Sequence, residues 1–289
     1  MQKHAYLIMA HGDWSLLSKL LQALDDVRND LYIHIDAKSA FDVGMVYQPV
    51  SAGVHFISRR TVTWGGDSQV WCELDLIKAA APQHYTYYHL LSGADMPLRS
   101  QNELHRFFDR QNGTNFIKID HVNTDNGSAQ QRVCKYRFFQ NHTGLKEGHI
   151  PNFLRLVERI SMSLQAFLGV DRLRNCPKKI YKGSNWFSIT DAMVQTVLAE
   201  EPFIRKYFSH SLASDELFLQ TIAMNSELRE TVADEYLRHI DWNRGGPYVF
   251  HTEDYEELMS CSAFFARKFS DQVDAQITDW ILKEVTKHE

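Results

Sequence analysis

The chain has 289 residues, of which 44% are hydrophobic, 12% aromatic and 23% charged, a balance that fits a globular protein and excludes disordered and collagen-like chains. Thirty-six acidic residues against 31 Lys and Arg give a net charge of −5, so the chain has no overall positive field that could hold a nucleic acid. A nucleic-acid partner is therefore not expected. The four cysteines form no Cys-X-X-Cys pair. Their scatter argues against a zinc site or a disulfide framework and favours a reducing compartment.

The first 120 residues alternate short apolar runs with helical patterns. Strands are predicted over 5–9, 30–35, 54–58, 85–91 and 115–119. Helices are predicted over 16–24, 68–81 and after the capping box Ser100-Gln101-Asn102-Glu103. This alternation predicts a mostly parallel sheet flanked by helices on both faces. Because ligands of such sheets collect at the carboxyl ends of the strands, we expect the chemistry in the turns after Met9, Ile35, Ser58 and Leu91.

The second part of the chain has a more helical pattern. Residues 120–150 are polar and are interpreted as a long functional loop or a small excursion. A helix over 151–168, a strand-like run over 179–190 and several further helices follow. The simplest organisation is one domain over 1–289 with a helical C-terminal half. No apolar run reaches the ~18 residues of a membrane span, and the first one is too short for a signal peptide.

Several common nucleotide, hydrolase and metal motifs are absent from the sequence. It contains neither the Gly-X-Gly-X-X-Gly of a dinucleotide site, nor a P-loop, nor a Gly-X-Ser-X-Gly elbow. Fourteen histidines are spread along the chain without a His-Glu-X-X-His, and there is no strict Asp-X-Asp. We therefore expect no metal and no other cofactor.

Seven segments together carry a resemblance to a known family. They are AYLIMAH (5–11), YIHIDAKS (32–39), VTWGGDS (62–68), LSGADMPL (91–98), KGSNWF (182–187), SDELF (214–218) and FARKF (265–269). In this order they resemble the core-2/I-branching family of glycosyltransferases, which includes β-1,6-N-acetylglucosaminyltransferases and peptide O-xylosyltransferases. The resemblance implies a GT-A-like, Rossmann-type α/β fold. Residues 1–120 would form the nucleotide-binding half and residues 121–289 the acceptor and catalytic half.

Three residues near the ends of predicted elements are candidates for nucleotide binding. Asp36 ends the second predicted strand, where its carboxylate can accept hydrogen bonds from a base or a ribose, although it equally fits a helix N-cap. Trp64 precedes two glycines that allow close backbone approach, so it fits either a wall for a nucleotide or sugar, or a core Trp beside a tight turn. Asp95 follows a predicted strand as a single acid, which suits a family described as working without a metal. The resemblance implies the nucleotide role for all three.

Glu216 is the candidate catalytic base. Ser214 fits an N-cap, which would place Asp215 and Glu216 in the first turn of a helix, where acids also stabilise the helix dipole without any function. The resemblance favours catalysis, because the base of the family is the Glu of a Pro/Ser-Asp-Glu string that opens a helix. A helix N-terminus would help to keep this carboxylate ionised, so that it can accept a proton from a sugar hydroxyl.

Basic residues near the C-terminus are candidates for holding the diphosphate of the donor. Arg267 and Lys268 precede Ser270, which fits the N-cap of a helix, and two cations beside free helix N–H groups would cradle a diphosphate without a metal. The alternative is a solvated basic pair, which the neighbouring phenylalanines disfavour. Arg244, beside two glycines, is a third candidate on the basis of the resemblance.

The acceptor site is predicted from a mixture of aromatic faces and hydrogen-bond donors. The candidate residues are Arg132, Lys135, Tyr136, Arg137 and Trp186. The resemblance implies an inverting transferase that moves a sugar, N-acetylglucosamine by preference, from a UDP-sugar to a carbohydrate or glycolipid hydroxyl. The membrane anchor and luminal disulfides of the animal relatives are lacking, so a bacterial, cytoplasmic enzyme of surface-glycan synthesis is expected, with possible contact at the inner membrane face. Protein O-xylosylation and a non-catalytic binding module are the alternatives.

Overall fold

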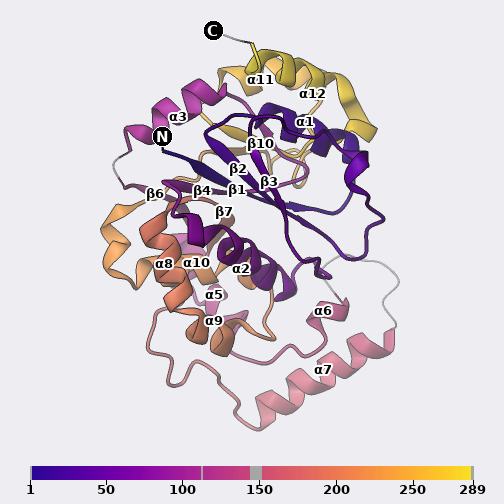
Figure 1. Ribbon diagram of the computed structural model, residues 1–289. Coiled ribbons are helices and arrows are strands. Elements are labelled where there is room, and N and C mark those ends of the chain that lie inside the picture. The colour runs from indigo at the N-terminus through magenta and orange to yellow at the C-terminus, as the bar shows by residue number, and fades with distance from the viewer. Residues whose placement is uncertain (1, 112, 144–151, 288–289) are drawn as a thin grey trace.

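The computed structural model of the chain describes residues 2–111, 113–143 and 152–287. Its centre is a seven-stranded sheet in the order β3-β2-β1-β4-β7-β6-β8 (Figure 1). The strands are β1 (His4–Ala10), β2 (Asn29–Ile35), β3 (Gly53–Phe56), β4 (Tyr87–Ser92), β6 (Asn115–Ile119), β7 (Gly183–Thr190) and β8 (Val232–Ala233). Strands β1 to β4 run parallel, whereas β7 is antiparallel to both of its neighbours. The mostly parallel, Rossmann-type α/β fold is confirmed.

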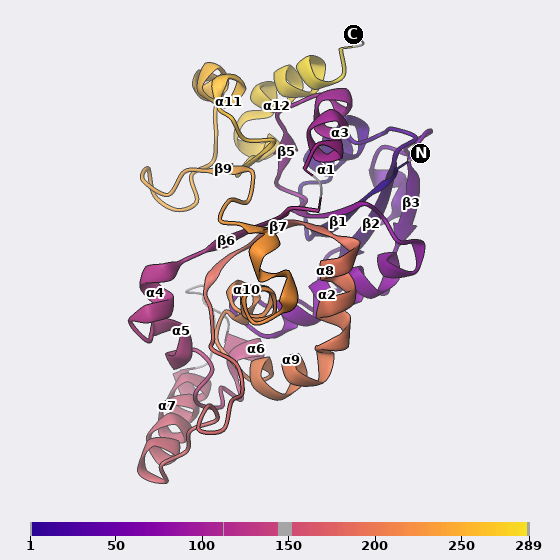
Figure 2. The same cartoon turned by 90° about the vertical axis from the view of Figure 1, so that its left-hand side faces the viewer.

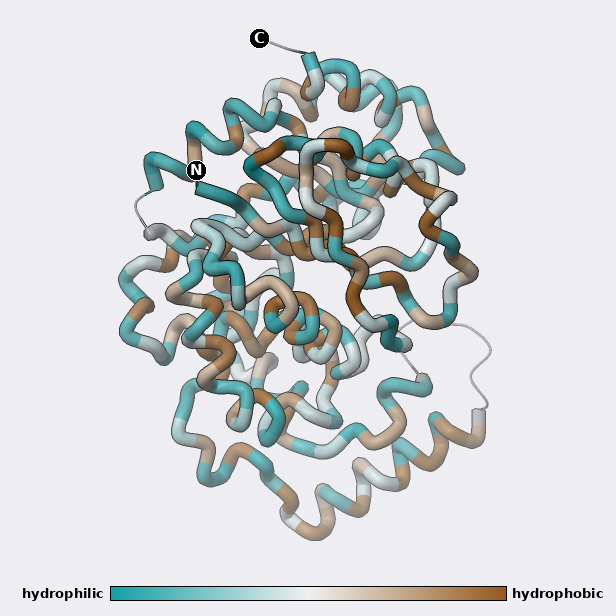
Figure 3. Tube along the Cα trace, in the orientation of Figure 1, coloured by the Kyte–Doolittle hydropathy of each residue, from teal (hydrophilic) through white to brown (hydrophobic). Residues whose placement is uncertain are grey.

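Helices cover both faces of this sheet, which is why its central strands are apolar on both sides. One face carries α1 (Trp14–Ala23), α3 (Gln101–Asp109), α11 (Tyr255–Ser260) and α12 (Asp271–Val285). The other carries α2 (Ser68–Ala80), α8 (Asp191–Ala199), α9 (Glu201–Phe208) and α10 (Phe218–Met224). Each face has its own hydrophobic core, and Figures 1 and 2 show the two helical layers on opposite sides of the strands. Figure 3 shows brown, hydrophobic stretches along these central strands.

A second, three-stranded sheet lies beside the end of β4. It consists of β5 (Met96–Pro97), β10 (Phe265–Arg267) and β9 (Arg238–Ile240), with β10 in the middle. Phe265 pairs with Pro97 and with Arg238. The small sheet therefore carries Arg267 to the turn that contains Asp95, although 172 positions separate the two residues in the sequence.

The predicted elements agree with the structure except in the middle of the chain and around Ser214. The capping box at Ser100 and Glu103 is present. Residues 120–143 are not one long loop, because they hold α4 (His121–Asp125), α5 (Ser128–Gln131) and α6 (Gln140–Thr143); residues 144–150 lie outside the described part. The helix predicted over 151–168 is α7 (Asn152–Phe167). Short 3₁₀ turns occupy Val43–Met45, Ala81–Gln83, Ser214–Glu216, Glu227–Thr231 and Thr252–Asp254.

Two smaller findings concern the helices and the thiols. Within the described ranges, no helix has both the length and the apolar character needed to cross a bilayer. The four cysteines are free, with Cys72 buried and the other three partly buried.

Candidate active site

A cavity of about 620 Å³ lies at the carboxyl ends of β1 and β2, where the sheet topology predicts a ligand. We call it the β1–β2 cavity. Its lining residues are His11, Gly12, Asp13, Trp14, Ser15, Ser39, Ala40, Asp271, Gln272 and Ala275. The Ser39 hydroxyl donates to the His11 carbonyl at 2.7 Å and so joins the two strand ends that border the cavity.

Asp36 lies at the end of β2, close to this cavity. Its carboxylate accepts the backbone N–H of Lys38 at 2.9 Å and lies 3.5 Å from the Lys38 ammonium. No α-helix begins here, so the alternative of a helix N-cap is wrong. Asp36 instead closes a tight turn that shapes the rim of the sheet.

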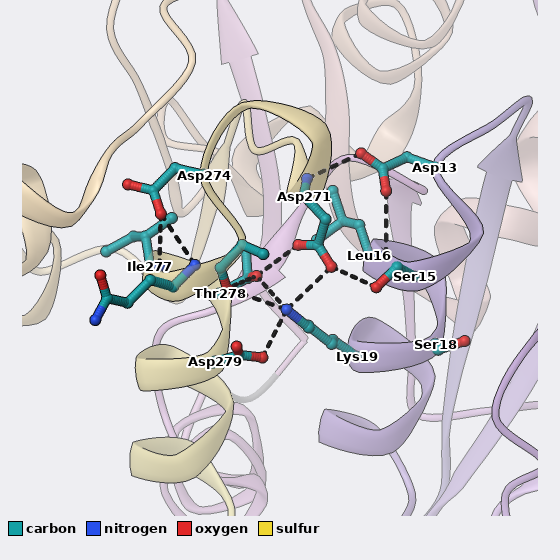
Figure 4. A network of polar contacts seen from close by, with 12 residues as sticks. Asp13, Ser15, Leu16, Ser18, Lys19, Asp271, Asp274, Ile277, Thr278 and Asp279 are labelled. Carbon is teal, nitrogen blue, oxygen red and sulfur yellow. Dashed lines mark hydrogen bonds and ion pairs between the residues drawn. The ribbon is translucent and has the colours of Figure 1, made fainter.

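Polar contacts between α1 and α12 form one wall of the β1–β2 cavity (Figure 4). The Asp13 carboxylate accepts the Leu16 N–H at 3.3 Å, and its other oxygen accepts the Asp271 N–H and the Ser270 hydroxyl, both at 2.9 Å. Lys19 lies 3.0 Å from Asp271 and anchors the same corner. Ser270 is the N-cap residue, as predicted, but Asp13 already occupies the first N–H of α12. The expected cradle of free helix N–H groups is therefore partly wrong.

Arg267 is held in a mostly buried position between an aromatic ring and a carboxylate. Its guanidinium lies 4.0 Å from the ring centroid of Trp186, and its Nε is 3.6 Å from Asp95. Burial lowers the pKa of Arg267, and the charge of Asp95 acts in the opposite direction. The Nε has no hydrogen-bond partner among the described residues. This Nε is itself buried beside Asp95, so an anionic ligand would have to bind through the remaining guanidinium N–H groups.

Asp95 and Trp186 are too buried for the ligand contacts that were expected of them. Asp95 is only 1% exposed, and its two oxygens accept the N–H and the hydroxyl of Ser92 at 2.9 and 2.7 Å. It therefore positions Arg267 and is too enclosed for the predicted contact with a nucleotide. Trp186 is buried beneath Arg267, so it supports the cation and does not line an acceptor surface.

The other two basic candidates have different surroundings. Lys268 is partly buried, and its backbone bonds to Tyr248 and Phe250 at 3.2 and 2.9 Å. Arg244 contacts three carboxylates, which belong to Asp241, Asp254 and Glu257. Its hydrogen bonds to Asp241 and then Asp254 raise its pKa. Because acids already neutralise Arg244, the structure argues against its predicted role as a diphosphate ligand.

Glu216 lies in the turn Ser214–Glu216 with two cations beside it. Arg132 Nη1 is 2.7 Å and Lys182 Nζ 3.8 Å from the same oxygen, Oε2, and the side chain is 36% exposed. The predicted N-cap role of Ser214 is wrong, since the turn is 3₁₀ and α10 begins only at Phe218. Side chains, and no helix dipole, therefore balance the charge of Glu216. Lys182 was missed as a site residue, although it opens the KGSNWF segment.

Trp64 projects from a loop that packs against this turn. The Gly65 carbonyl accepts the Ala213 N–H at 2.8 Å, and the Gly65 N–H donates to Gln69 at 2.7 Å. Gly65 has a φ of 78°, a conformation that disfavours other residues. Trp64 is 55% exposed, so the alternative of a core Trp is wrong.

Two buried carboxyl groups lie beneath Glu216, and sequence reasoning missed both. Burial, and then the charge of Glu216, raises the pKa of Asp215 to about 7, while Gln69 donates to it at 3.0 Å. Glu73 is fully buried, and neither of its oxygens has a hydrogen-bond partner in the described part of the chain. Burial, reinforced by Asp215, raises its pKa well above the usual range. The raised pKa of both groups favours their neutral forms, which limits the negative charge near Glu216.

The remaining acceptor candidates lie along one segment after α5. Arg132 reaches Glu216, as described above. Tyr136 stacks on Phe138 with ring centroids 5.5 Å apart, and the Arg172 guanidinium lies 4.3 Å from the Tyr136 ring centroid. Lys135 and Arg137 are partly buried in the same segment. The structure therefore brings Arg132 to Glu216 and leaves the exposed aromatic pair of Tyr136 and Phe138 farther along the segment.

The sequence of the chain is similar to those of known proteins. The chain is 26% identical to xylosyltransferase 2 from Rattus norvegicus over 95% of its length, and 27% identical to the Homo sapiens protein over the same share. Xylosyltransferase 1 from Homo sapiens is 25% identical over 94% of the chain. The chain spans about a third of the length of these relatives, namely 33%, 33% and 29%.

A solved structure and a family model complete the comparison. A putative glucose-1-phosphate thymidylyltransferase from Bacillus anthracis, in complex with a sucrose, covers 71% of the chain and 78% of its own chain at 12% identity. Its TM-score of 0.29 is too low to support an inference. The family model described as Core-2/I-Branching enzyme matches residues 4–261. The chain therefore belongs to the Core-2/I-Branching enzyme family of glycosyltransferases.

Proposed function

We propose that the chain transfers a sugar from a UDP-sugar to an acceptor hydroxyl, with inversion at the anomeric carbon. The observation that carries the proposal is the pairing of Glu216 with Arg132 and Lys182 in a partly exposed turn. A carboxylate held by two cations in a partly exposed turn is an arrangement suited to deprotonating a hydroxyl. Family membership and the xylosyltransferase relatives support transfer of a sugar.

Glu216 would act as the general base through the oxygen that the cations leave available. Both contacts fall on Oε2, so Oε1 is the oxygen that would accept the proton of the acceptor hydroxyl. Arg132 and Lys182 would hold the carboxylate in place, so that the hydroxyl of the sugar acceptor donates its proton to a fixed oxygen. The activated oxygen would then attack the anomeric carbon on the face opposite the diphosphate.

Arg267 and Lys268 would stabilise the departing diphosphate, while the β1–β2 cavity would take the nucleoside. Arg267 is oriented by Asp95 and Trp186 and can offer a fork of donors to phosphate oxygens. Trp186, which stacks on Arg267, lies in β7 four positions after Lys182, the cation beside Glu216, so one segment of the chain supports both parts of the proposed site.

The donated sugar is proposed to be N-acetylglucosamine or xylose, and the acceptor a carbohydrate or glycolipid hydroxyl. The names of the xylosyltransferase relatives support xylose as strongly as the sequence pattern supports N-acetylglucosamine, and transfer of xylose to a protein hydroxyl is the alternative activity. A screen of purified protein against a panel of UDP-sugars, with release of UDP as the readout, separates these donors. Binding of UDP without hydrolysis or transfer from any donor would favour a non-catalytic binding module.

Replacement of the base tests the mechanism. Glu216→Gln keeps the shape of the side chain and removes the proton acceptor, so turnover should fall by about a hundredfold or more. UDP affinity, measured by calorimetry, should stay close to that of the wild type. Glu256→Gln, an exposed acid on α11, is the matched control and should leave both quantities unchanged. Near-normal transfer by Glu216→Gln would refute the assignment.

A further inference from the structure

The helix α7 exposes its apolar side. Its exposed large side chains, which we call the α7 face, are Phe153, Leu156, Ile160, Leu164, Phe167 and Leu168. Steps of three and four residues put them on one stripe of the helix. Phe167, at the end of this stripe, is 86% exposed. Figures 1 and 2 both show α7 at the end of the molecule opposite α11 and α12.

The side of α7 that faces the protein is mixed, because Leu154 and Met162 are half-buried there beside Gln165 and Glu158. Gln165 is 7% exposed, accepts the Tyr136 N–H at 2.8 Å and donates to the Tyr136 carbonyl at 2.9 Å. Glu158 accepts the Phe139 N–H at 3.3 Å. These hydrogen bonds hold the helix against the protein, and the α7 face stays exposed and available to a partner.

The charges around the α7 face are mainly positive, although the whole chain carries −5. Arg155 and Arg159 are exposed on the helix, and Arg174 is exposed just beyond it. Glu158 is turned inward, as described above. Asp171, the exposed acid between 153 and 174, accepts the N–H of Leu173 at 2.9 Å.

We propose that the α7 face docks on an anionic lipid surface, with its apolar side chains in the acyl boundary and its arginines at the headgroups. An exposed apolar stripe flanked by arginines is the pattern of helices that lie in the plane of a membrane interface. Each arginine gains from the negative potential of such a surface. The docking is independent of whether the proposed transferase reaction is correct.

A second copy of the chain fits this face less well. Two α7 faces packed together would gather four arginines, Arg155 and Arg159 from each copy, while the only acid on the described part of the helix, Glu158, faces inward. Like charges brought together disfavour association. Charge complementarity therefore favours anionic lipid.

Docking in this orientation would bring the acceptor segment to the bilayer. Tyr136 is bonded to Gln165 of α7, and Arg132, four residues earlier, reaches Glu216. If the proposed function holds, a lipid-linked acceptor could be presented to the base without leaving the membrane surface.

Sedimentation with vesicles tests the docking without any assay of transfer. The full chain should sediment with phosphatidylglycerol vesicles and not with phosphatidylcholine vesicles, and added salt should weaken the binding. The double variant Ile160→Ser/Phe167→Ser should lower partitioning roughly tenfold or more. Arg155→Gln/Arg159→Gln should lower it about fivefold for each arginine. Val50→Ser is the control, because Val50 is an exposed apolar residue in the loop before β3.

Each outcome bears on the proposal. Thermal melting should show that all variants fold as the wild type does, and Val50→Ser should bind vesicles normally. Absence of sedimentation of the wild type would overturn the inference. Equal binding to both lipids would overturn the choice of an anionic surface. Concentration-dependent dimers without lipid, abolished by Ile160→Ser/Phe167→Ser, would show that a second copy is the occupant.

Discussion

Replacement of Asp215 by asparagine tests the electrostatics beneath the proposed base. Asp215 is buried next to Glu216, and one of its oxygens accepts a hydrogen bond from Gln69 at 3.0 Å. Burial and the charge of Glu216 raise its pKa from 3.8 to about 7. Asparagine keeps the shape and the bond from Gln69 but stays neutral at every pH.

The sign of the effect follows from the protons bound by each state. Between about pH 4 and pH 7 the folded protein keeps the proton on Asp215 and the unfolded chain releases it, so folding stability falls as pH rises. The shift of about 3 pKa units corresponds to roughly 4 kcal/mol at ~1.4 kcal/mol per unit. Asp215→Asn lacks this penalty. The variant should therefore be more stable than the wild type by up to about 4 kcal/mol at pH 8, with little difference near pH 4.

Urea unfolding of both proteins across this pH range measures the effect. The difference between the two free energies of unfolding cancels the titrating groups that do not interact with Asp215, and it leaves Asp215 together with its neighbour Glu73, whose pKa Asp215 raises. Glu256→Gln, which removes one exposed acid far from Asp215 in the sequence, is the control for the loss of a single negative charge. Parallel curves for Asp215→Asn and the wild type would show that Asp215 ionises in its ordinary range, and the account of the field around Glu216 would be wrong.

Three further outcomes are expected in assays of transfer. Arg132→Gln should lower kcat by about tenfold or more with UDP affinity retained, because it releases the carboxylate of Glu216; a parallel loss of affinity would place Arg132 in the donor site instead. Lys268→Ala should cost roughly 2–4 kcal/mol in kcat/KM. Arg267→Lys should lower activity as well, because it loses the planar stack on Trp186. If calorimetry of both variants showed an unchanged preference for UDP over uridine, the diphosphate role of these residues would be contradicted. Activity should survive saturating EDTA, and loss with recovery on adding manganese would show that a metal is required.

Local signals in the sequence were sufficient for most of the fold. Mostly apolar runs mark β1, β2 and β4, because strands that are buried on both faces favour apolar side chains, although buried His4, His34 and His89 interrupt them. The capping box at Ser100 marks the start of α3, since its hydrogen bonds lie within four residues. Short strings in a constant order also pointed to the family and to Glu216.

Tertiary packing decided which of the candidate side chains meet. Arg132 and Lys182 reach Glu216 from positions 84 and 34 residues away, and no local pattern encodes such contacts. Packing also buries Asp95 beside Arg267 and places Arg244 among acidic side chains. These partners come from distant parts of the sequence or from loops, so the local pattern does not predict them. The 3₁₀ turn at Glu216 arises in the same way, from its contacts with the loop that carries Trp64.

The helix α7 shows the same division. Its periodic pattern was enough to predict a helix over 151–168, and the pattern also defines an apolar stripe. Periodicity says that a helix has two unlike faces, but not which one the rest of the protein will cover. In the structure, Gln165 and Glu158 accept hydrogen bonds from the segment 136–139, so their side of α7 faces the protein and the apolar stripe stays exposed.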